Sequence, residues 1–146
     1  PGAAAPIGEG RVVSGEKKAE VAILTYGNGL RLSLRAAKRL AADGIRARVT
    51  DLRWLLPIDT ALCVREASAA GRVLIVDECR RTAGPGEQIV TALVEAGVDA
   101  AIARVTAEDT YVPLGPAADL VHPSEDGILA AARALAGGAR SATRRS

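Results

Sequence analysis

The chain has 146 residues, of which 49% are hydrophobic and 25% are charged. This length and composition predict one globular domain that buries its own core without a disulfide framework. With two cysteines and one histidine, the sequence holds no C-x-x-C motif and no His/Cys cluster, which excludes a zinc site of the usual spacing. No apolar stretch is long enough for a membrane span and no secretory signal pattern appears, so we expect a reduced, cytoplasmic protein.

The net charge of +2 comes from the C-terminal end. Residues 137–146 contain three arginines, whereas residues 1–136 hold 16 basic and 17 acidic groups. The chain also has only one Trp, two Tyr and no Phe to stack on bases. A nucleic-acid partner is therefore not expected, because such a partner needs a basic face with aromatic platforms.

The two ends have the composition of linkers. Residues 1–18 predict a Pro/Gly/Ala linker followed by a short edge strand at Arg11–Val13, residues 19–137 an α/β domain, and residues 138–146 a flexible basic tail. A start at Pro1 without methionine suggests a piece of a longer protein or a processed chain.

The first half of the domain alternates between short apolar runs and helical periodicity. Val21–Tyr26 is a buried-strand pattern, and the apolar residues from Leu30 to Ala41 recur at helical spacing until Gly44. A second strand is expected over residues 46–52. A second helix then runs to Ala70, with Asp59 as its N-cap.

The second half repeats the alternation. Arg72–Val76 is the clearest buried strand, followed by a Gly/Pro loop over residues 83–86 and a helix over residues 87–96. Residues 101–105 predict another strand, and residues 128–135 the last helix, with Ser124 as its cap. The pattern predicts a three-layer α/β/α fold with a mostly parallel five-stranded sheet and one antiparallel edge strand.

Two turns at strand ends invite a functional interpretation. In an open parallel sheet, ligands bind beyond the carboxyl ends of the strands. The segment Tyr26–Gly29 could hold an anion on its backbone amides, but it lacks the third glycine of a dinucleotide fingerprint, so a tight turn is favoured. Asp51-Leu52-Arg53 is interpreted as a structural ion pair or a solvated loop rather than a substrate clamp.

The richest polar cluster follows the strand at Arg72–Val76. Asp77 and Glu78 could tune each other's pKa for acid/base chemistry, whereas Arg80 and Arg81 could grip the carboxylates of a partner. A surface role without function is the third alternative. We favour partner contact, and our hypothesis is an interface patch made of Glu78, Arg80 and Arg81.

The remaining reactive side chains lack partners in the sequence. His122 precedes Pro123 in a loop, and Cys79 has arginines nearby but no evident base. A loop or capping role is expected for His122, and a nucleophilic role is not expected for Cys79. The sequence therefore predicts no catalytic, cofactor-binding or metal-binding residue in this chain.

Several stretches in register resemble one known family. Ala22–Gly27 matches an opening strand and turn, and Asp51–Asp59 matches the pattern D-L-R-x-L-x-P-x-D. Arg72–Glu78 and then Arg81–Gly86 resemble V-x-E-x-x-R-T-G-G-x-G, and Asp109–Pro113 and Pro123-Ser124 complete the set. Over about residues 7–136, the chain resembles the C-terminal domain of the transketolase superfamily. The nearest similarity is to the beta subunit, or beta-like half, of the thiamine diphosphate-dependent decarboxylating component of 2-oxoacid dehydrogenases.

The chain departs from the family pattern at four positions. Asp77 stands where the beta subunits often have histidine, and Ala83 replaces the first loop glycine. Arg80 and Pro85 replace a proline and an aromatic residue. The role of that histidine is therefore not carried over to this chain.

The resemblance implies a role in assembly rather than in the chemistry itself. The complete enzyme would use thiamine diphosphate and magnesium, held by a G-D-G…N-N motif that this sequence lacks, so no cofactor is expected on this domain alone. The implied partners are the cofactor-binding domain or alpha subunit, a second copy in a homodimer and, in some relatives, the lipoyl acyltransferase. The alternatives are a domain of transketolase or deoxyxylulose-phosphate synthase, and a stand-alone protein-interaction module.

Overall fold

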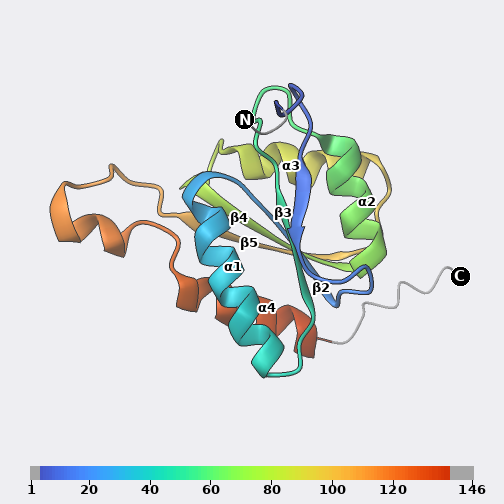
Figure 1. The fold of residues 1–146 in the computed structure, drawn as a ribbon. Helices are drawn as coiled ribbons and strands as arrows, with labels where there is room; N and C mark the ends of the chain where they lie inside the picture. Colours follow the sequence, from blue (N-terminus) through green and yellow to red (C-terminus); the bar gives the residue numbers. More distant parts are fainter. Residues whose placement is uncertain (1–3, 139–146) are drawn as a thin grey trace, which may run out of the picture.

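The computed structural model describes residues 4–138 as five strands and four α-helices in a three-layer arrangement (Figure 1). The strands are β1 (Arg11–Ser14), β2 (Val21–Thr25), β3 (Ala47–Asp51), β4 (Arg72–Arg80) and β5 (Ala101–Ala107). The α-helices are α1 (Gly27–Ala42), α2 (Thr60–Ala70), α3 (Pro85–Glu95) and α4 (Glu125–Gly137), and a 3-10 helix, η1, spans Gly115–Leu120. Residues 1–3 and 139–146, which include most of the expected basic tail, lie outside the described residues.

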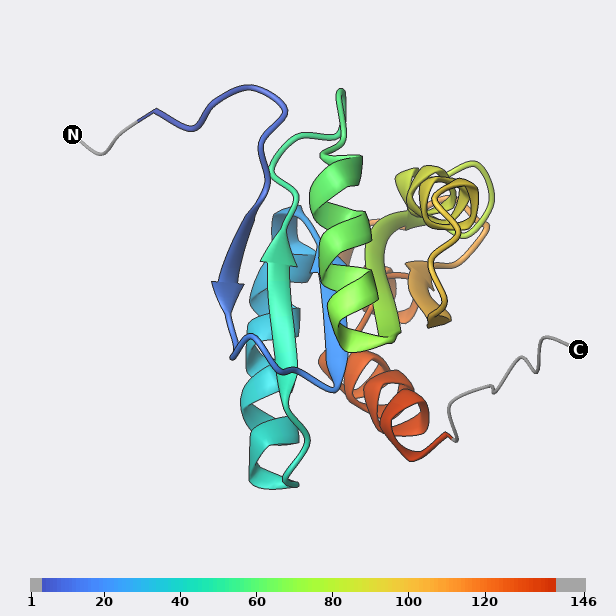
Figure 2. The ribbon, with the colours of Figure 1, turned by 90° about the vertical axis from the view of Figure 1, so that its right-hand side faces the viewer.

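The sheet has the strand order β1-β3-β2-β4-β5. Strands β3, β2, β4 and β5 run parallel, and β1 pairs antiparallel with β3 at the edge. The predicted fold class is therefore confirmed, including the antiparallel edge strand. The four parallel strands end at one edge of the sheet, which we call the carboxyl edge, and the segments that follow them gather there (Figures 1 and 2).

Two apolar clusters fill the space between the layers. One cluster lies under α1 and α4 and contains Ile23, Leu74 and Val76, and the other lies under α2 and α3 and contains Leu24 and Ile75. Successive residues of a strand point to opposite faces of the sheet, so β2 and β4 supply both clusters from one continuous apolar run.

Capping side chains fix several helix ends as the sequence predicts. The Asp59 carboxylate accepts a hydrogen bond from the Leu62 amide at 2.9 Å, and the Ser124 hydroxyl accepts one from the Gly127 amide at 3.0 Å. Asp59 also accepts a hydrogen bond from the Gly10 amide at 3.1 Å, which holds the N-terminal segment against α2. Each cap satisfies an amide that the helix itself leaves without a partner.

Several predicted boundaries are wrong. Strand β5 extends to Ala107 rather than ending at residue 105, and α4 runs from Glu125 to Gly137 rather than over residues 128–135. Strand β4 continues through Arg80 instead of ending at Val76, with an irregular register between Asp77 and Arg80 opposite β5. The polar residues from Asp77 to Arg80 therefore belong to the strand itself. The irregular register is a β-bulge, which lets β4 continue to pair with β5 beyond Val76. Helix α3 begins at Pro85 rather than near residue 87, because proline suits the first helical position, where no amide donor is needed.

None of the helices in residues 4–138 is long and apolar enough to cross a membrane.

Candidate functional site

The carboxyl ends of β2 and β4 form the topological switch point of the sheet. From β2 the chain moves to β3 on one side, and it later returns through β4 and β5 on the other side. The crevice between two such strands is where open α/β domains place their ligands. In this chain Tyr26 and the turn after β2 meet Asp77 and Glu78 of β4 at this position.

Asp77 is fully buried and accepts three hydrogen bonds. Its Oδ2 accepts one from the Gly86 amide at 2.7 Å, in the first turn of α3. Its Oδ1 accepts one from the Tyr26 hydroxyl at 2.5 Å and one from the Cys79 amide at 2.8 Å. A buried carboxylate requires such donors, and the positive end of the α3 dipole stabilises its charge further.

Glu78 performs the same task on the opposite face of the sheet. Its Oε1 accepts a hydrogen bond from the Gly29 amide at 2.7 Å, in the first turn of α1. Helix α1 has no side-chain cap from its own N-cap residue, Tyr26, so Glu78 supplies the missing acceptor from β4. A Cβ on Gly27, where φ is +55°, would lie 2.6 Å from Glu78 Oε1, which explains glycine at this turn.

The two carboxylates therefore occupy the positions in which an anionic ligand would bind. The Gly29 and Gly86 amides, at the N-termini of α1 and α3, already donate to the chain's own side chains. A diphosphate at the switch point would meet two carboxylates and engaged amides, so these residues do not fit the cofactor that the resemblance implies for the complete enzyme. In residues 4–138, no group of three or more His, Cys, Asp or Glu side chains is arranged to hold a metal ion.

The Tyr26 hydroxyl connects the end of β2 to Asp77 of β4. Burial raises the pKa of this hydroxyl well above the ordinary value, and the hydrogen bond to Asp77 adds to the shift. The hydroxyl also lies 3.4 Å from Cys79 Sγ. Tyr26 therefore acts as a permanent donor at neutral pH and is not a candidate acid or base.

The loop after β4 is held by side chains from three other elements. Thr82 donates from its amide and its hydroxyl to the Asp109 carboxylate, at 2.9 and 2.5 Å. The Arg104 guanidinium of β5 donates to the Arg81 carbonyl at 2.6 Å, and the Ala83 amide donates to Glu87 at 3.0 Å. The loop holds Ala83 at φ +57°, a left-handed conformation that such fixed contacts must maintain.

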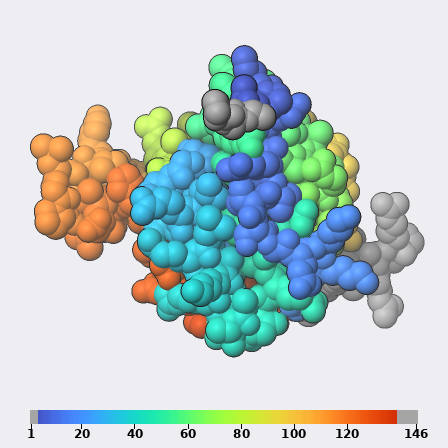
Figure 3. All heavy atoms as spheres, in the orientation of Figure 1, coloured from blue at the N-terminus to red at the C-terminus, as the bar shows by residue number. Residues whose placement is uncertain are grey.

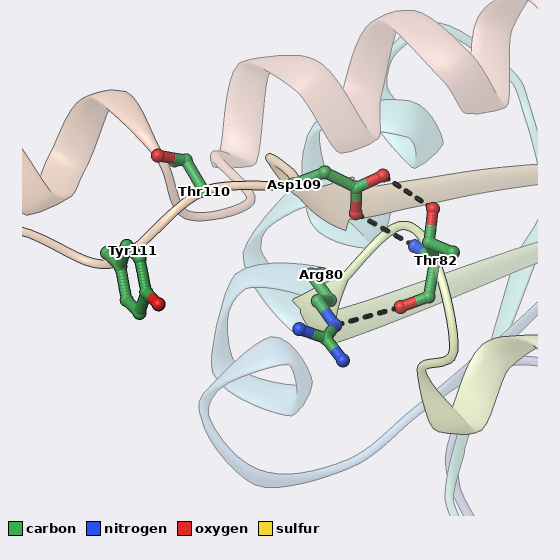
Figure 4. Close-up of a pocket in the computed structure, with 5 residues that line it drawn as sticks. All are labelled: Arg80, Thr82, Asp109, Thr110 and Tyr111. Carbon is green, nitrogen blue, oxygen red and sulfur yellow. Dashed lines mark hydrogen bonds between the residues drawn. The ribbon is translucent and has the colours of Figure 1, made fainter.

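A hollow of about 620 Å³ opens between this loop and the segment after β5 (Figure 4). It is lined by Arg80, Thr82 and residues 109–111. Arg80 donates from Nε to the Thr82 carbonyl at 3.1 Å, and its two terminal nitrogens have no hydrogen-bond partner among residues 4–138. These nitrogens are available to a ligand or to a partner chain.

Residues 108–122 project from the body of the domain as an arm (Figures 1 and 3). The base of the arm is closed by a hydrogen bond from the Glu108 amide to the Val121 carbonyl at 3.1 Å and by the Thr82–Asp109 contacts. Three large apolar side chains on it are almost fully exposed, namely Tyr111 at 96%, Leu114 at 97% and Leu120 at 84%.

The structure separates Glu78 from the other two residues of the predicted interface patch. Arg80 and Arg81 are exposed at the carboxyl edge, and Arg80 lines the hollow. Glu78 is half-buried beneath α1 and faces a second hollow of about 350 Å³, which His122 and Asn28 also line. The patch remains a prediction for Arg80 and Arg81, whereas Glu78 has a structural contact that the sequence did not suggest.

The other predicted positions have structural contacts. Asp51 accepts a hydrogen bond from the Arg53 amide at 3.1 Å and lies 3.9 Å from Arg11, so its ion pair is with β1 rather than with the Arg53 side chain. Cys79 is exposed, and no base contacts its sulfur among the described residues.

Sequence reasoning did not predict the contacts of three residues that hold the site. Asp109, Arg104 and Tyr26 each contact a residue at least 23 positions away, so no local spacing reveals the contacts. The sequence did contain one indication of the Asp109–Thr82 contact. Asp109 and the pair Arg81-Thr82 both belong to motifs of the family that the chain resembles.

Comparison with known proteins decides the family. The model of the transketolase C-terminal domain matches residues 8–128, which is most of the chain. The chain belongs to the transketolase C-terminal domain family. The resemblance stated from the sequence is therefore confirmed, and the matched region includes the switch point and the arm.

Two curated relatives are beta subunits of the pyruvate dehydrogenase E1 component. The chain is 36% identical over 118 residues to the pyruvate dehydrogenase E1 component subunit beta of Staphylococcus epidermidis, which is 79% of this chain and 36% of that protein. The Staphylococcus aureus subunit of the same name is 35% identical over 117 residues, 78% of this chain and 36% of that protein. The chain thus spans about a third of the length of these relatives.

Two solved structures share the fold. A split-gene transketolase described as an inactive beta4 tetramer aligns with a TM-score of 0.80 at 29% identity, over 90% of this chain and 43% of that one. A 2-oxoglutarate:ferredoxin oxidoreductase from Magnetococcus marinus aligns with a TM-score of 0.61 at 15% identity, over 88% of this chain and 20% of that one. The second likeness concerns the fold alone.

The buried carboxylate of Asp77 gives a first prediction. Asp77→Asn replaces one carboxylate oxygen by an NH₂ group, which would face one of the N–H or O–H donors that now bind Asp77. We expect the free energy of unfolding to fall by about 1–3 kcal/mol. Asp119→Asn is the matched control, because Asp119 is exposed and has no hydrogen bond or ion pair within residues 4–138. Urea unfolding measures both variants, and equal stabilities for the two would contradict the proposed role of Asp77.

The contact between Asp109 and Thr82 gives a prediction on pH. The hydrogen bonds from the Thr82 hydroxyl and amide hold the pKa of Asp109 below its ordinary value of 3.8, and the nearby Arg80 charge contributes. Because the pKa is lower in the folded state, the contact is at full strength above pH 3.8 and is lost as the pH falls through the lowered pKa. We expect the NMR signal of the Thr82 amide to titrate with a midpoint below 3.8.

Asp109→Asn is the control for this titration, and it should abolish the transition. A midpoint at or above 3.8 in the unmodified chain would show that the Asp109–Thr82 contact does not stabilise the ionised carboxylate.

Proposed function

We propose that this chain is the C-terminal, assembly-supporting domain of a thiamine diphosphate-dependent 2-oxoacid dehydrogenase. The enzyme would decarboxylate a pyruvate-like or branched-chain 2-oxoacid and pass the acyl group to lipoyl. The observation that carries the proposal is the 36% identity to a pyruvate dehydrogenase beta subunit over 118 residues. Thr82 and Asp109, which belong to the motifs that carry the resemblance, also hold the loop and the base of the arm.

The geometry of the switch point supports a domain that is inactive alone. Asp77 and Glu78 engage the amides that an anionic cofactor would need. Thiamine diphosphate and magnesium would therefore bind to another part of the complete enzyme, and the decarboxylation chemistry belongs to them. This domain would contribute by binding that part, by contacts between copies in a homodimer and, in the assembled complex, by contact with the lipoyl acyltransferase.

A second candidate function is ketol transfer between sugar phosphates. It is favoured by the overlap with the split-gene transketolase, which extends over 90% of this chain at a TM-score of 0.80. The two candidates share the fold and differ in the substrate, so the domain alone does not separate them.

The assay that separates them uses the complete enzyme, with this chain and the cofactor-binding part, supplied with thiamine diphosphate and magnesium. We expect ferricyanide reduction with pyruvate or a branched-chain 2-oxoacid, and no ketol transfer from xylulose 5-phosphate. Omission of thiamine diphosphate is the control and should abolish the signal. Turnover of the sugar phosphate alone would replace the first candidate by the second.

The interface patch predicts a loss of assembly on charge reversal. We propose that Arg80 and Arg81 contact carboxylates of a partner, with Glu78 holding the strand beneath them against α1. Arg80→Glu combined with Arg81→Glu should weaken assembly of the complete enzyme at least tenfold, because like charges would then meet across the interface. Sedimentation velocity measures the assembly.

Arg31→Glu is the matched control for this variant. Arg31 is exposed on α1 and has no ion pair or hydrogen bond from its side chain within residues 4–138. Unchanged assembly of the double variant would remove Arg80 and Arg81 from the interface.

A further inference from the structure

The exposed apolar side chains of this domain gather at the carboxyl edge. Nine large hydrophobic side chains are exposed within residues 4–138. Seven of them lie in three segments beside that edge: Ile7, Leu55 and Leu56, and four residues of the arm. The other two are Leu34 on α1 and Val94 on α3.

These segments flank the edge from both ends. Arg11, which opens β1, pairs with Asp51, the last residue of β3, so the segment before β1 lies at the carboxyl edge. A Cβ on Gly8 would come within 3.0 Å of Pro57, which places this segment against the turn that carries Leu56. In Figure 1 the N-terminal segment and this turn lie at the top and the arm lies at the left, with the loop after β4 between them.

The apolar side chains at this edge are more exposed than is usual on a protein surface that faces only water. Leu56 is 86% exposed, and Leu114 and Leu120 are 97% and 84% exposed. Scattered apolar residues are normal on a protein surface, but their concentration along one edge is typical of a protein-binding surface. Asp77 and Glu78 already engage the Gly86 and Gly29 amides, so these amides are not available to a small anion, and the exposed apolar flanks suit a protein partner.

The polar residues at this edge specify what the partner must offer. Arg80 lines the hollow beside the arm, close enough to Asp109 to lower the pKa of that carboxyl, but it forms no salt bridge and its two terminal nitrogens have no hydrogen-bond partner among residues 4–138. The arm itself carries three acidic residues, Glu108, Asp109 and Asp119, and no lysine or arginine. The complementary surface is thus apolar, with a carboxylate facing Arg80 and a basic group facing the arm.

The amount of chain outside the structure indicates the occupant. The curated relatives are nearly three times as long as the region that this chain matches, so most of each relative lies outside it. We infer that the carboxyl edge is the surface on which the cofactor-binding part of the complete enzyme packs, with the arm as the main contact. This inference rests on the proposed function only for the existence of that part, and it assigns the surface that receives it.

Photo-cross-linking in the complete enzyme tests the inference. A diazirine-bearing amino acid replaces Leu114, the purified enzyme is irradiated, and cross-linked peptides are identified by mass spectrometry. We expect cross-links to the cofactor-binding part, at a yield at least ten times that of the same amino acid in place of Val94. Val94 is 67% exposed on α3 and is the matched control.

Two results would overturn the inference. Cross-links from position 114 to residues 1–146 of a second copy would make the edge a contact between copies. A yield equal to that at position 94 would show that the arm is open to solvent in the complete enzyme.

The test does not depend on the substrate. An enzyme that acts on sugar phosphates would give the same cross-links and no 2-oxoacid turnover, which is a failure of the proposed function alone. Turnover of a 2-oxoacid without the expected cross-links would be a failure of the inference alone.

Discussion

The arrangement of the carboxyl edge depends on two adjacent carboxylates at the end of one strand. Asp77 and Glu78 point to opposite faces of β4 because side chains alternate along a strand. Each therefore reaches the N-terminus of a helix on its own face, α3 for Asp77 and α1 for Glu78. One dipeptide thus anchors both outer layers to β4, an inner strand of the sheet. The stabilisation comes from charge-assisted hydrogen bonds to helix amides, which are stronger than those between neutral groups.

This arrangement changes what the fold can do at its switch point. In nucleotide-binding α/β domains, helix N-termini at the same position are available to an anionic ligand. Here the anions are part of the chain, so the helix dipoles contribute to stability instead of recognition. The edge that would otherwise hold a ligand carries a loop held by Asp109 and Arg104 and an arm with apolar side chains on its surface. A ligand-binding architecture is thereby suited to contact with another protein.

The sequence predicted the fold because the fold is encoded in local patterns. The apolar runs of β2 and β4, the caps at Asp59 and Ser124 and the Gly-rich turns each act over a few residues. The family motifs then pointed to the loop after β4 and to the segment that begins at Asp109. The contacts of Asp77 and Glu78 were not predictable, because both the bulge that extends β4 and the bonds to Gly86 and Gly29 follow from packing. Likewise, Glu78 was grouped with Arg80 by proximity in sequence, whereas the pleat of the strand directs it toward α1.

The alternation along β4 also limits how this family can vary in length. Deletion or insertion of one residue between Arg72 and Val76 would exchange the faces of all later side chains, so Asp77 would point toward α1 and Glu78 toward α3. The glutamate side chain is one methylene longer, and a Cβ on Gly86 would already lie 2.7 Å from Asp77 Oδ2, so the exchange would leave a longer group in the tighter site. Related chains should therefore tolerate changes of length in the arm or in the turn at residues 52–58 while β4 keeps its residue count. New partner surfaces in this domain should therefore evolve in the segments outside the sheet, such as the arm and the turn at residues 52–58.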